Sequence, residues 1–387
     1  MITLQKTPYV TVFLGGLLSL LLLPSLAKAE RPIIAGPNAN SSSASRNQKM
    51  SAFQYPNTRR DNTEDSYHGT KVTDPYRWLE DTESEETANW VEAQNKVTFD
   101  YLRNISTRQP IVDRLTSLWN YERFGRPFKR GDFYFYSHNN GLQNQSVLYV
   151  TNSLESEARV LLDPNQWSQE GTKALSSYAP SPNGKLMAYS ISSAGSDWRE
   201  WHVLNVETGE RLDDHIQWSK FSSASWANDN SGFYYSRYDE PKEGEEFSGT
   251  NYFQKLYFHK IGTSQSEDQL IYQRADQKEW GFGGYVTEDG NYLIISVWKG
   301  SDRKNQLFYK DLTKADAKVV ELISGFDADY DFIGNARNRF WILTDLDAPQ
   351  KRVVEIDLNE PSRNNWQTLI EEAEHRLESI SNTGGHF

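Results

Sequence analysis

The sequence has no cysteine among its 387 residues. This absence excludes disulfide bonds, a thiol nucleophile, zinc–thiolate sites and a lipid anchor on an N-terminal cysteine. It does not decide between a reducing and an oxidising compartment, because a chain without thiols has nothing to oxidise.

Basic charge is scarce as well. Lysine and arginine number 41 against 53 aspartates and glutamates, which gives a net charge of -12. An acidic surface repels phosphate backbones, and no stretch of the chain forms a basic stripe. The composition therefore predicts no nucleic-acid partner and a surface charge that favours solubility.

Long apolar runs are missing except at the N-terminus. Val10 to Leu23 is a run of 14 residues, which is short of the roughly 20 that span a bilayer as a helix. Lys6 precedes it, Pro24 ends it, and Ala27-Lys28-Ala29 supplies small residues at the expected cleavage positions. Residues 1–29 are therefore predicted to be a signal peptide, with an uncleaved anchor as the alternative, and the chain to be periplasmic or secreted, without membrane contact after cleavage.

The next segments differ sharply in composition. Residues 30–52 are rich in serine, asparagine and alanine, and we expect them to be a flexible linker. Residues 53–125 are predicted to be a helical N-terminal segment. Thr82 and Glu85 have the spacing of a capping box, and Pro110 suits the first turn of a second helix. The apolar positions of these helices are Trp90, Ala93, Val97, Tyr101, Ile105, Ile111, Leu115 and Leu118. This apolar face needs something to cover it.

From about residue 129 a turn followed by an aromatic or aliphatic strand recurs. Its copies are 130–136, 182–189, 230–235, 289–294 and, more weakly, 338–343. A second apolar strand follows each copy, anchored in turn by Leu148, Val203, Leu256, Leu307 and Val353. These anchors are separated by 55, 53, 51 and 46 residues.

Four-stranded antiparallel units at a period near 50 residues are typical of a β-propeller, whose blades bury their faces against each other. An irregular β-sandwich is the alternative, but it would not keep five copies in phase. Residues 126–387 are therefore predicted to be a truncated β-propeller of about five blades, with 379–387 beginning a sixth. The fold class is mainly β, preceded by the α-helical segment.

Several stretches are more specific than the repeat. They are 55–60, 67–69, the Asp-Pro-Tyr-Arg-Trp-Leu-Glu run of 74–80, 90–95, 141–149, 192–198 and 266–268. In this order they resemble the N-terminal portion of the prolyl oligopeptidase family. The resemblance implies a propeller that caps an α/β-hydrolase domain and limits substrates to short peptides. It implies cleavage after proline by serine, aspartate and histidine, and a hydrolase domain that is missing from this chain.

The residues themselves offer little chemistry. No Gly-x-Ser-x-Gly elbow occurs, and the nearest imitation, 262–266, lacks the second glycine and lies in a turn between strands. The histidines at 68, 138, 202, 215, 259, 375 and 386 make no His-x-x-x-His pair. Asp213-Asp214 and Glu371-Glu372 are interpreted as solvated faces. The sequence thus predicts no catalytic residue, no metal site and no cofactor, and leaves the substrate-binding residues unknown.

Tryptophans 198, 201, 218, 226, 280 and 298 are interpreted as blade core rather than a carbohydrate platform. In the family, propeller side chains near the domain boundary contact substrate. The matching regions here, near 196–203 and 270–272, do not agree securely enough to assign residues.

Two functions remain at this point. The first is the N-terminal propeller portion of a prolyl oligopeptidase, a serine endopeptidase family. That portion would be inactive alone and would meet short proline-containing peptides only when joined to a hydrolase domain. The alternative is a non-catalytic periplasmic propeller that acts as a binding or scaffold module.

Overall fold

The computed structural model describes residues 54–246, 249–383 and 386–387. The predicted signal peptide and the predicted linker lie outside these residues. Within them, no helix combines the length and the apolar character that crossing a membrane requires. The chain divides into two compact units, with the boundary between Trp119 and Asn120.

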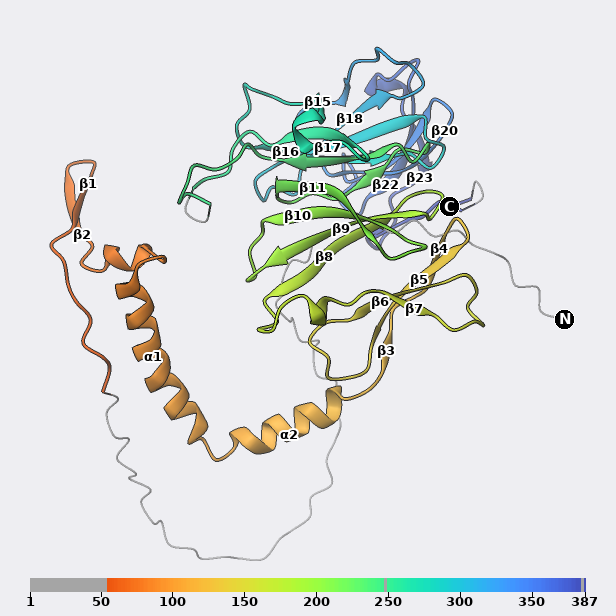
Figure 1. Ribbon diagram of the computed structural model, residues 1–387. Helices are drawn as coiled ribbons and strands as arrows, with labels where there is room; N and C mark the ends of the chain where they lie inside the picture. Colours follow the sequence, from red (N-terminus) through yellow and green to blue (C-terminus); the bar gives the residue numbers. More distant parts are fainter. Residues whose placement is uncertain (1–53, 247–248, 384–385) are drawn as a thin grey trace, which may run out of the picture. The chain divides into compact units, whose positions relative to one another are not determined.

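The N-terminal unit contains a hairpin and two helices (Figure 1). Its elements are β1 (Glu64–Tyr67), β2 (Thr70–Thr73), the 3-10 helix η1 (Arg77–Glu80), α1 (Glu85–Arg103) and α2 (Arg108–Trp119). The predicted cap at Thr82 is wrong by two residues. Ser84 is the N-cap of α1, and its hydroxyl accepts a hydrogen bond from the Thr87 amide.

The motif that resembled a peptidase opening holds this unit together. Arg77 binds Asp74 and Asp65, which ties η1 to the hairpin. The Trp90 indole donates to the Thr58 hydroxyl, and the Trp78 indole donates to the Arg59 carbonyl. The conspicuous residues of this segment therefore act locally, as structural contacts.

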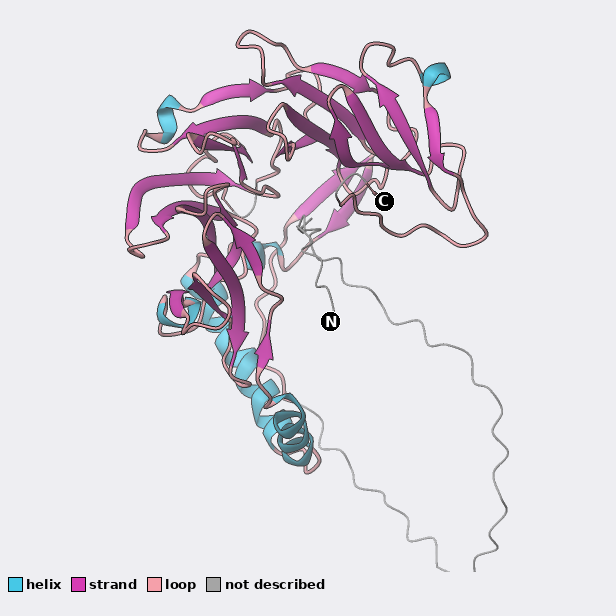
Figure 2. Cartoon of the chain, turned by 90° about the vertical axis from the view of Figure 1, so that its right-hand side faces the viewer, coloured by secondary structure: helices cyan, strands magenta, loops and turns pink. Residues whose placement is uncertain are grey.

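Within the described residues, the C-terminal unit consists of five consecutive antiparallel sheets, four of four strands and one of five. Each is a contiguous piece of chain, and Figure 2 shows their strands in magenta. The first contains β3 (Arg123–Phe124), β4 (Phe128–Arg130), β5 (Phe133–Asn139), β6 (Val147–Thr151) and β7 (Arg159–Leu162). The second contains β8 (Lys173–Pro180), β9 (Leu186–Ser193), β10 (Arg199–Asn205) and β11 (Arg211–Ser219).

The remaining three sheets repeat the same order. The third contains β12 (Ser225–Trp226), β13 (Gly232–Arg237), β14 (Lys255–Lys260) and β15 (Gln269–Tyr272). The fourth contains β16 (Trp280–Val286), β17 (Tyr292–Lys299), β18 (Gln306–Asp311) and β19 (Val320–Ile323). The fifth contains β20 (Tyr330–Ala336), β21 (Arg339–Thr344), β22 (Arg352–Asp357) and β23 (Gln367–Ile370). We call these sheets blades 1 to 5, and they confirm the predicted mainly β fold.

Alternating side chains of one strand reach two different cores, as expected for a sheet buried on both faces. In β9, Met187 and Tyr189 join the core between blades 1 and 2, whereas Ala188 joins the core between blades 2 and 3. In β17, Ile294 contributes to the core between blades 4 and 5, and Leu293 to the one between blades 3 and 4. Four cores between five blades therefore stabilise this unit.

Each predicted turn between the first and second strand of a blade has one residue with a left-handed backbone. These residues are Gly131, Gly184, Asn230, Gly290 and Arg337, with φ of 52°, 75°, 62°, 74° and 55°. Glycine and asparagine tolerate this conformation, which explains why they mark the turns in the sequence. In the fifth turn this residue is an arginine, and the corresponding copy of the sequence repeat, 338–343, is the weaker one.

After blade 5 no further strand is formed within the described residues, so the start of a sixth blade at 379–387 stays a prediction. Thr383 and His386 form an isolated antiparallel bridge. The ring of Phe387 packs edge-on against Trp341 of β21, with centroids 5.1 Å apart. The last aromatic residue thus covers part of blade 5.

Candidate functional site

The candidate site lies at one end of the blades. In an antiparallel blade, the connections from the second to the third strand all emerge at the same end. In blades 2 to 5 these connections are 194–198, 238–254, 300–305 and 345–351, and the one in blade 3 is the longest. Binding residues concentrate on such connections because a rigid scaffold positions them. We call this the loop end of the propeller unit.

Three aromatic side chains meet at the loop end of blades 2 and 3. Trp198 packs edge-on against Trp218 and Tyr238, with centroids 5.7 and 6.1 Å away. The Lys220 ammonium lies 4.2 Å from the centroid of the Trp198 ring. Burial lowers the pKa of Lys220, although the neighbouring Asp197 opposes this shift. This cluster presents a cation held against aromatic rings.

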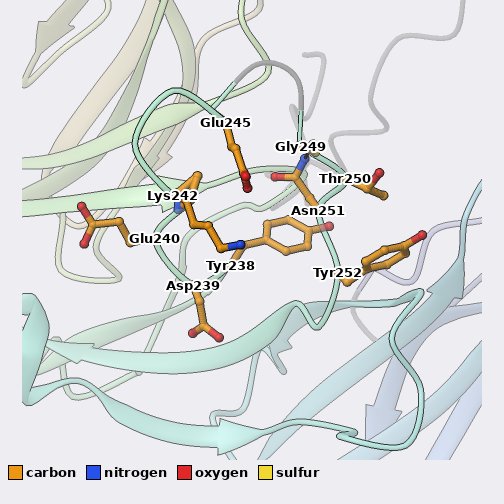
Figure 3. A pocket seen from close by; sticks show the side chains of 10 residues that line it. Tyr238, Asp239, Glu240, Lys242, Glu245, Gly249, Thr250, Asn251 and Tyr252 are labelled. Carbon is orange, nitrogen blue, oxygen red and sulfur yellow. Dashed lines mark hydrogen bonds between the residues drawn. The ribbon is translucent and has the colours of Figure 1, made fainter.

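The Trp198 indole also fixes the long connection of blade 3. Its N–H donates to the Glu246 carbonyl at 2.7 Å. A hollow of about 210 Å³ lies within this connection, and Figure 3 shows the side chains around it. Its lining residues are Tyr238, Asp239, Glu240, Pro241, Lys242, Glu245, Gly249, Thr250, Asn251 and Tyr252. The Lys255 ammonium binds the lining residue Asp239 at 2.6 Å, so the site is polar and carries charges of both signs.

A second hollow, of about 410 Å³, lies at the loop end of blades 4 and 5. It is lined by Ser301, Asp302, Arg303, Lys304, Asp329 and Asp345. Beside it the nearly buried Lys351 ammonium contacts Asp329 at 2.7 Å and Asp331 at 3.0 Å. The loop end thus carries two polar hollows and an aromatic cluster, with fixed charges of both signs.

The residues considered as a nucleophile lie elsewhere. Ser264 and Ser266 follow β14, in the connection from the third to the fourth strand of blade 3, at the opposite end from the loop end. There Ser264 and Glu267 form a capping box on a 3-10 helix, η3 (Gln265–Glu267). These serines stabilise a turn between strands, where the sequence analysis placed them.

Asp214 corrects the interpretation of the Asp213-Asp214 pair as a solvated face. Asp213 is exposed, but Asp214 is buried and accepts from the Gly262 amide at 2.7 Å. His259, also buried, lies between Asp214 at 3.0 Å and Asp268 at 2.7 Å. The Tyr235 hydroxyl donates to Asp268 at 2.6 Å. The sequence missed this cluster because its members come from separate strands.

Burial opposes a charge on His259, but the hydrogen bonds and charges of Asp214 and Asp268 outweigh it and raise the pKa of His259 to about 9. The cluster joins blade 2 to blade 3. It is closed to solvent and offers no nucleophile, so its role is structural.

The tryptophans divide into two groups. Trp201 and Trp226 lie in the core between blades 2 and 3, as predicted. Trp198, Trp218, Trp280 and Trp298 are half-buried. Trp298 packs over Gly281, where a Cβ would come within 2.3 Å of the ring.

The two regions left unassigned in the sequence both approach the loop end. Trp198 belongs to the aromatic cluster described above. Tyr272 ends β15, and its hydroxyl donates to Glu321 at 2.9 Å while its ring packs edge-on against Phe282 and Phe308. Tyr272 is therefore a packing residue of blades 3 and 4, whereas Trp198 packs against Tyr238, which lines the first hollow.

Comparison with known proteins identifies relatives over most of the chain. A family model described as "Prolyl oligopeptidase, N-terminal beta-propeller domain" matches residues 56–387. The prolyl endopeptidase of Elizabethkingia meningoseptica is 41% identical over 340 residues, which cover 88% of this chain and 48% of that protein. The prolyl endopeptidase of Dictyostelium discoideum is 31% identical, over 85% of this chain and 52% of that protein. The chain thus spans about half the length of these curated relatives.

Comparison with solved structures identifies relatives of the same family. Prolyl oligopeptidase B from Galerina marginata, bound to a 35mer hydrolysis and macrocyclization substrate, superimposes with a TM-score of 0.74 at 30% identity. That match covers 85% of this chain and 49% of the other. A chain from a structural study of two prolyl endopeptidases matches with a TM-score of 0.62 at 35% identity, covering 85% of this chain and 47% of the other.

Proposed function

The chain belongs to the prolyl oligopeptidase family, as an N-terminal β-propeller portion, and on this premise we propose two things. The first is that it forms the part of a proline-specific serine peptidase that borders the active site and limits access to short proline-containing peptides. The second is that the chain by itself hydrolyses no peptide bond.

The lack of a nucleophile elbow supports inactivity. No Gly-x-Ser-x-Gly occurs in the sequence. Among the described residues, no serine hydroxyl makes a hydrogen bond to a histidine ring, and the histidine partners at 138, 215 and 259 are carboxylates. Acyl transfer needs a serine activated by a base and an oxyanion hole that stabilises the transition state. Among the described residues no serine is activated in this way.

The side chains of the loop end support a role in binding peptide substrates. Its carboxylates can accept hydrogen bonds from peptide N–H groups, and aromatic faces such as that of Trp198 can pack against proline rings.

The test of inactivity is an assay of the purified chain with a blocked Gly-Pro chromogenic peptide. We expect no release of chromophore above buffer, because no serine among the described residues is hydrogen-bonded to a histidine that could activate it. The full-length Elizabethkingia meningoseptica relative serves as the positive control. Turnover that co-elutes with the chain and is abolished by a serine-reactive phosphonate would refute the proposal.

We also propose export to the periplasm or the exterior, on the strength of the Val10–Leu23 run and Ala27-Lys28-Ala29. Mass spectrometry of the protein from the exported fraction should give a chain that begins at Glu30. A chain that retains Met1 to Ala29 and stays in the cytosol would contradict this.

A further inference from the structure

The hairpin formed by β10 and β11 at the edge of blade 2 brings three potential metal ligands together. His202 of β10 is paired directly with His215 of β11. Glu200 lies two residues before His202, so strand alternation places both on the same face. The sequence keeps the two histidines 13 positions apart, and only the register of the hairpin brings them together.

The three side chains lie close to one another. The imidazole rings are stacked with centroids 4.8 Å apart and an interplanar angle of 21°. The Glu200 carboxylate lies 2.7 Å from Nε2 of His215. One ligand atom from each residue lies within 4.8 Å of the other two. Tetrahedral ligands held about 2.1 Å from a zinc ion are about 3.4 Å apart, and an imidazole nitrogen binds a metal in the plane of its own ring. The partly exposed His215 ring must therefore turn out of the stacked arrangement, and Glu200 must move with it, for the three ligands to surround one ion.

An independent observation concerns His202. It is 97% buried, at 3% exposure, yet its Nδ1 atom has no hydrogen-bond partner. Neither ring nitrogen of His202 takes part in a hydrogen bond within the described part of the chain. Buried polar atoms nearly always have a hydrogen-bond partner. A buried imidazole without one, beside two other potential ligands, therefore indicates that it binds something else, such as a metal ion.

The environment divides the roles among the three side chains. His202 is fixed by burial, whereas His215 and Glu200 are partly exposed, with side-chain exposures of 38% and 51%, and are free to adjust. Arg211 and Lys173 lie close enough to act on His202 electrostatically and would oppose a cation. The Glu200 carboxylate offsets part of that repulsion, so we expect a site of moderate affinity.

We propose that Glu200, His202 and His215 bind one divalent transition-metal ion, with Zn²⁺ as the reference ion, and that the ion clips β10 to β11. Two imidazoles and one carboxylate are ligands that suit zinc, copper and nickel, and they are too few in oxygen for Ca²⁺ or Mg²⁺. Three protein ligands leave one position for water. This proposal departs from the expectation from histidine spacing, which predicted no metal.

The test is isothermal titration calorimetry of Zn²⁺ into the purified chain without an affinity tag. We expect one Zn²⁺ per chain, and at least a tenfold weaker affinity in His215→Ala and in Glu200→Gln. Both changes are at exposed positions, so circular dichroism should show the native fold retained. The same chain titrated with Co²⁺ should develop the visible absorption of a tetrahedral site, and Mg²⁺ in excess should not compete.

The matched control is His138→Ala. His138 also pairs with a carboxylate, Glu122 at 2.8 Å, but on blade 1 and without a third ligand. It should leave Zn²⁺ affinity unchanged. The proposal is overturned if the wild-type chain takes up no Zn²⁺, if His215→Ala binds as tightly as wild type, or if His138→Ala weakens binding equally.

Discussion

His259 is the residue whose environment departs most clearly from what its sequence context suggests. Its ring is closed to solvent and lies between the carboxylates of Asp214 and Asp268. Burial alone would hold the ring neutral, but these two partners raise its pKa to about 9. At neutral pH the molecule therefore contains a buried imidazolium between two carboxylates.

This raised pKa predicts a pH dependence of stability. An unfolded histidine titrates near 6.5, so the stabilisation is complete below about pH 6.5 and is lost as the pH rises through about 9. The thermal unfolding midpoint of the wild type should fall over this window. The fall should be shallower in His259→Gln, which is expected to be less stable at every pH. His375→Gln, at an exposed position, should keep the wild-type profile; parallel profiles for wild type and His259→Gln would contradict the assignment.

Contacts between neighbouring blades explain how the elements stay in register. The Trp226 indole of blade 3 donates to the Ala179 carbonyl of blade 2 at 2.8 Å. The Asn183 amide donates to the Asn230 side chain at 3.0 Å, which joins two equivalent turns. The Asp214–His259 pair adds a buried ionic link between β11 and β14. Each link joins positions roughly one repeat apart in the chain.

Asp214→Asn tests the ionic link between blades 2 and 3. The change removes one charge of a buried pair, which typically costs roughly 3–5 kcal/mol. The neighbouring Asp213→Asn is the matched control, because its side chain is exposed and surface changes stay within about 0.5 kcal/mol. Urea unfolding at pH 7 measures both. Equal stability of the two variants would show that Asp214 carries no such link.

The strands of the blades differ in how well the sequence predicts them. The second and third strands, such as β17 and β18, contain apolar runs buried on both faces, and all five pairs were located from turn and anchor residues. The fourth strands β7, β15, β19 and β23 have only four residues each. In every blade the register shifts between the third and the fourth strand. A bulge breaks the two-residue period on which strand prediction depends.

Candidate-site residues were harder to predict than strands, for a related reason. His202 and His215 meet across a hairpin, and Asp214 and His259 meet across two blades. Their spacing in the chain carries no signal, because strand register and blade packing decide the distances. The pattern Glu-x-His on a predicted strand, followed by a histidine in the next strand, was the one available hint for the first pair.

At the scale of the whole molecule, the helices carry apolar side chains in an unusual place. Leu115 and Leu118 of α2 are each 49% exposed, and Ile111 is exposed as well. The sequence predicts that this apolar face needs something to cover it, and all three side chains are exposed among the described residues. Exposed apolar groups at helical spacing favour association with another surface.

We therefore predict that the purified chain self-associates. Size-exclusion chromatography with light scattering should give species larger than 44.6 kDa, and Leu115→Ser with Leu118→Ser should shift them toward the monomer. Leu154→Ser is the control, because Leu154 is 57% exposed but lies in a turn of blade 1. A monodisperse wild-type monomer at high concentration would count against this prediction and favour a self-sufficient binding module.

The order of strands within each blade has a consequence for biosynthesis. In blades 2 to 5 every strand hydrogen-bonds only to its neighbours in the chain, so no pairing waits for a distant segment. Contacts that are local in sequence form early and quickly. Each blade is one contiguous segment of about fifty residues, so all of its strands are available as soon as that segment has left the ribosome. A blade that has formed can then bury the apolar face of the next blade as that one is synthesised.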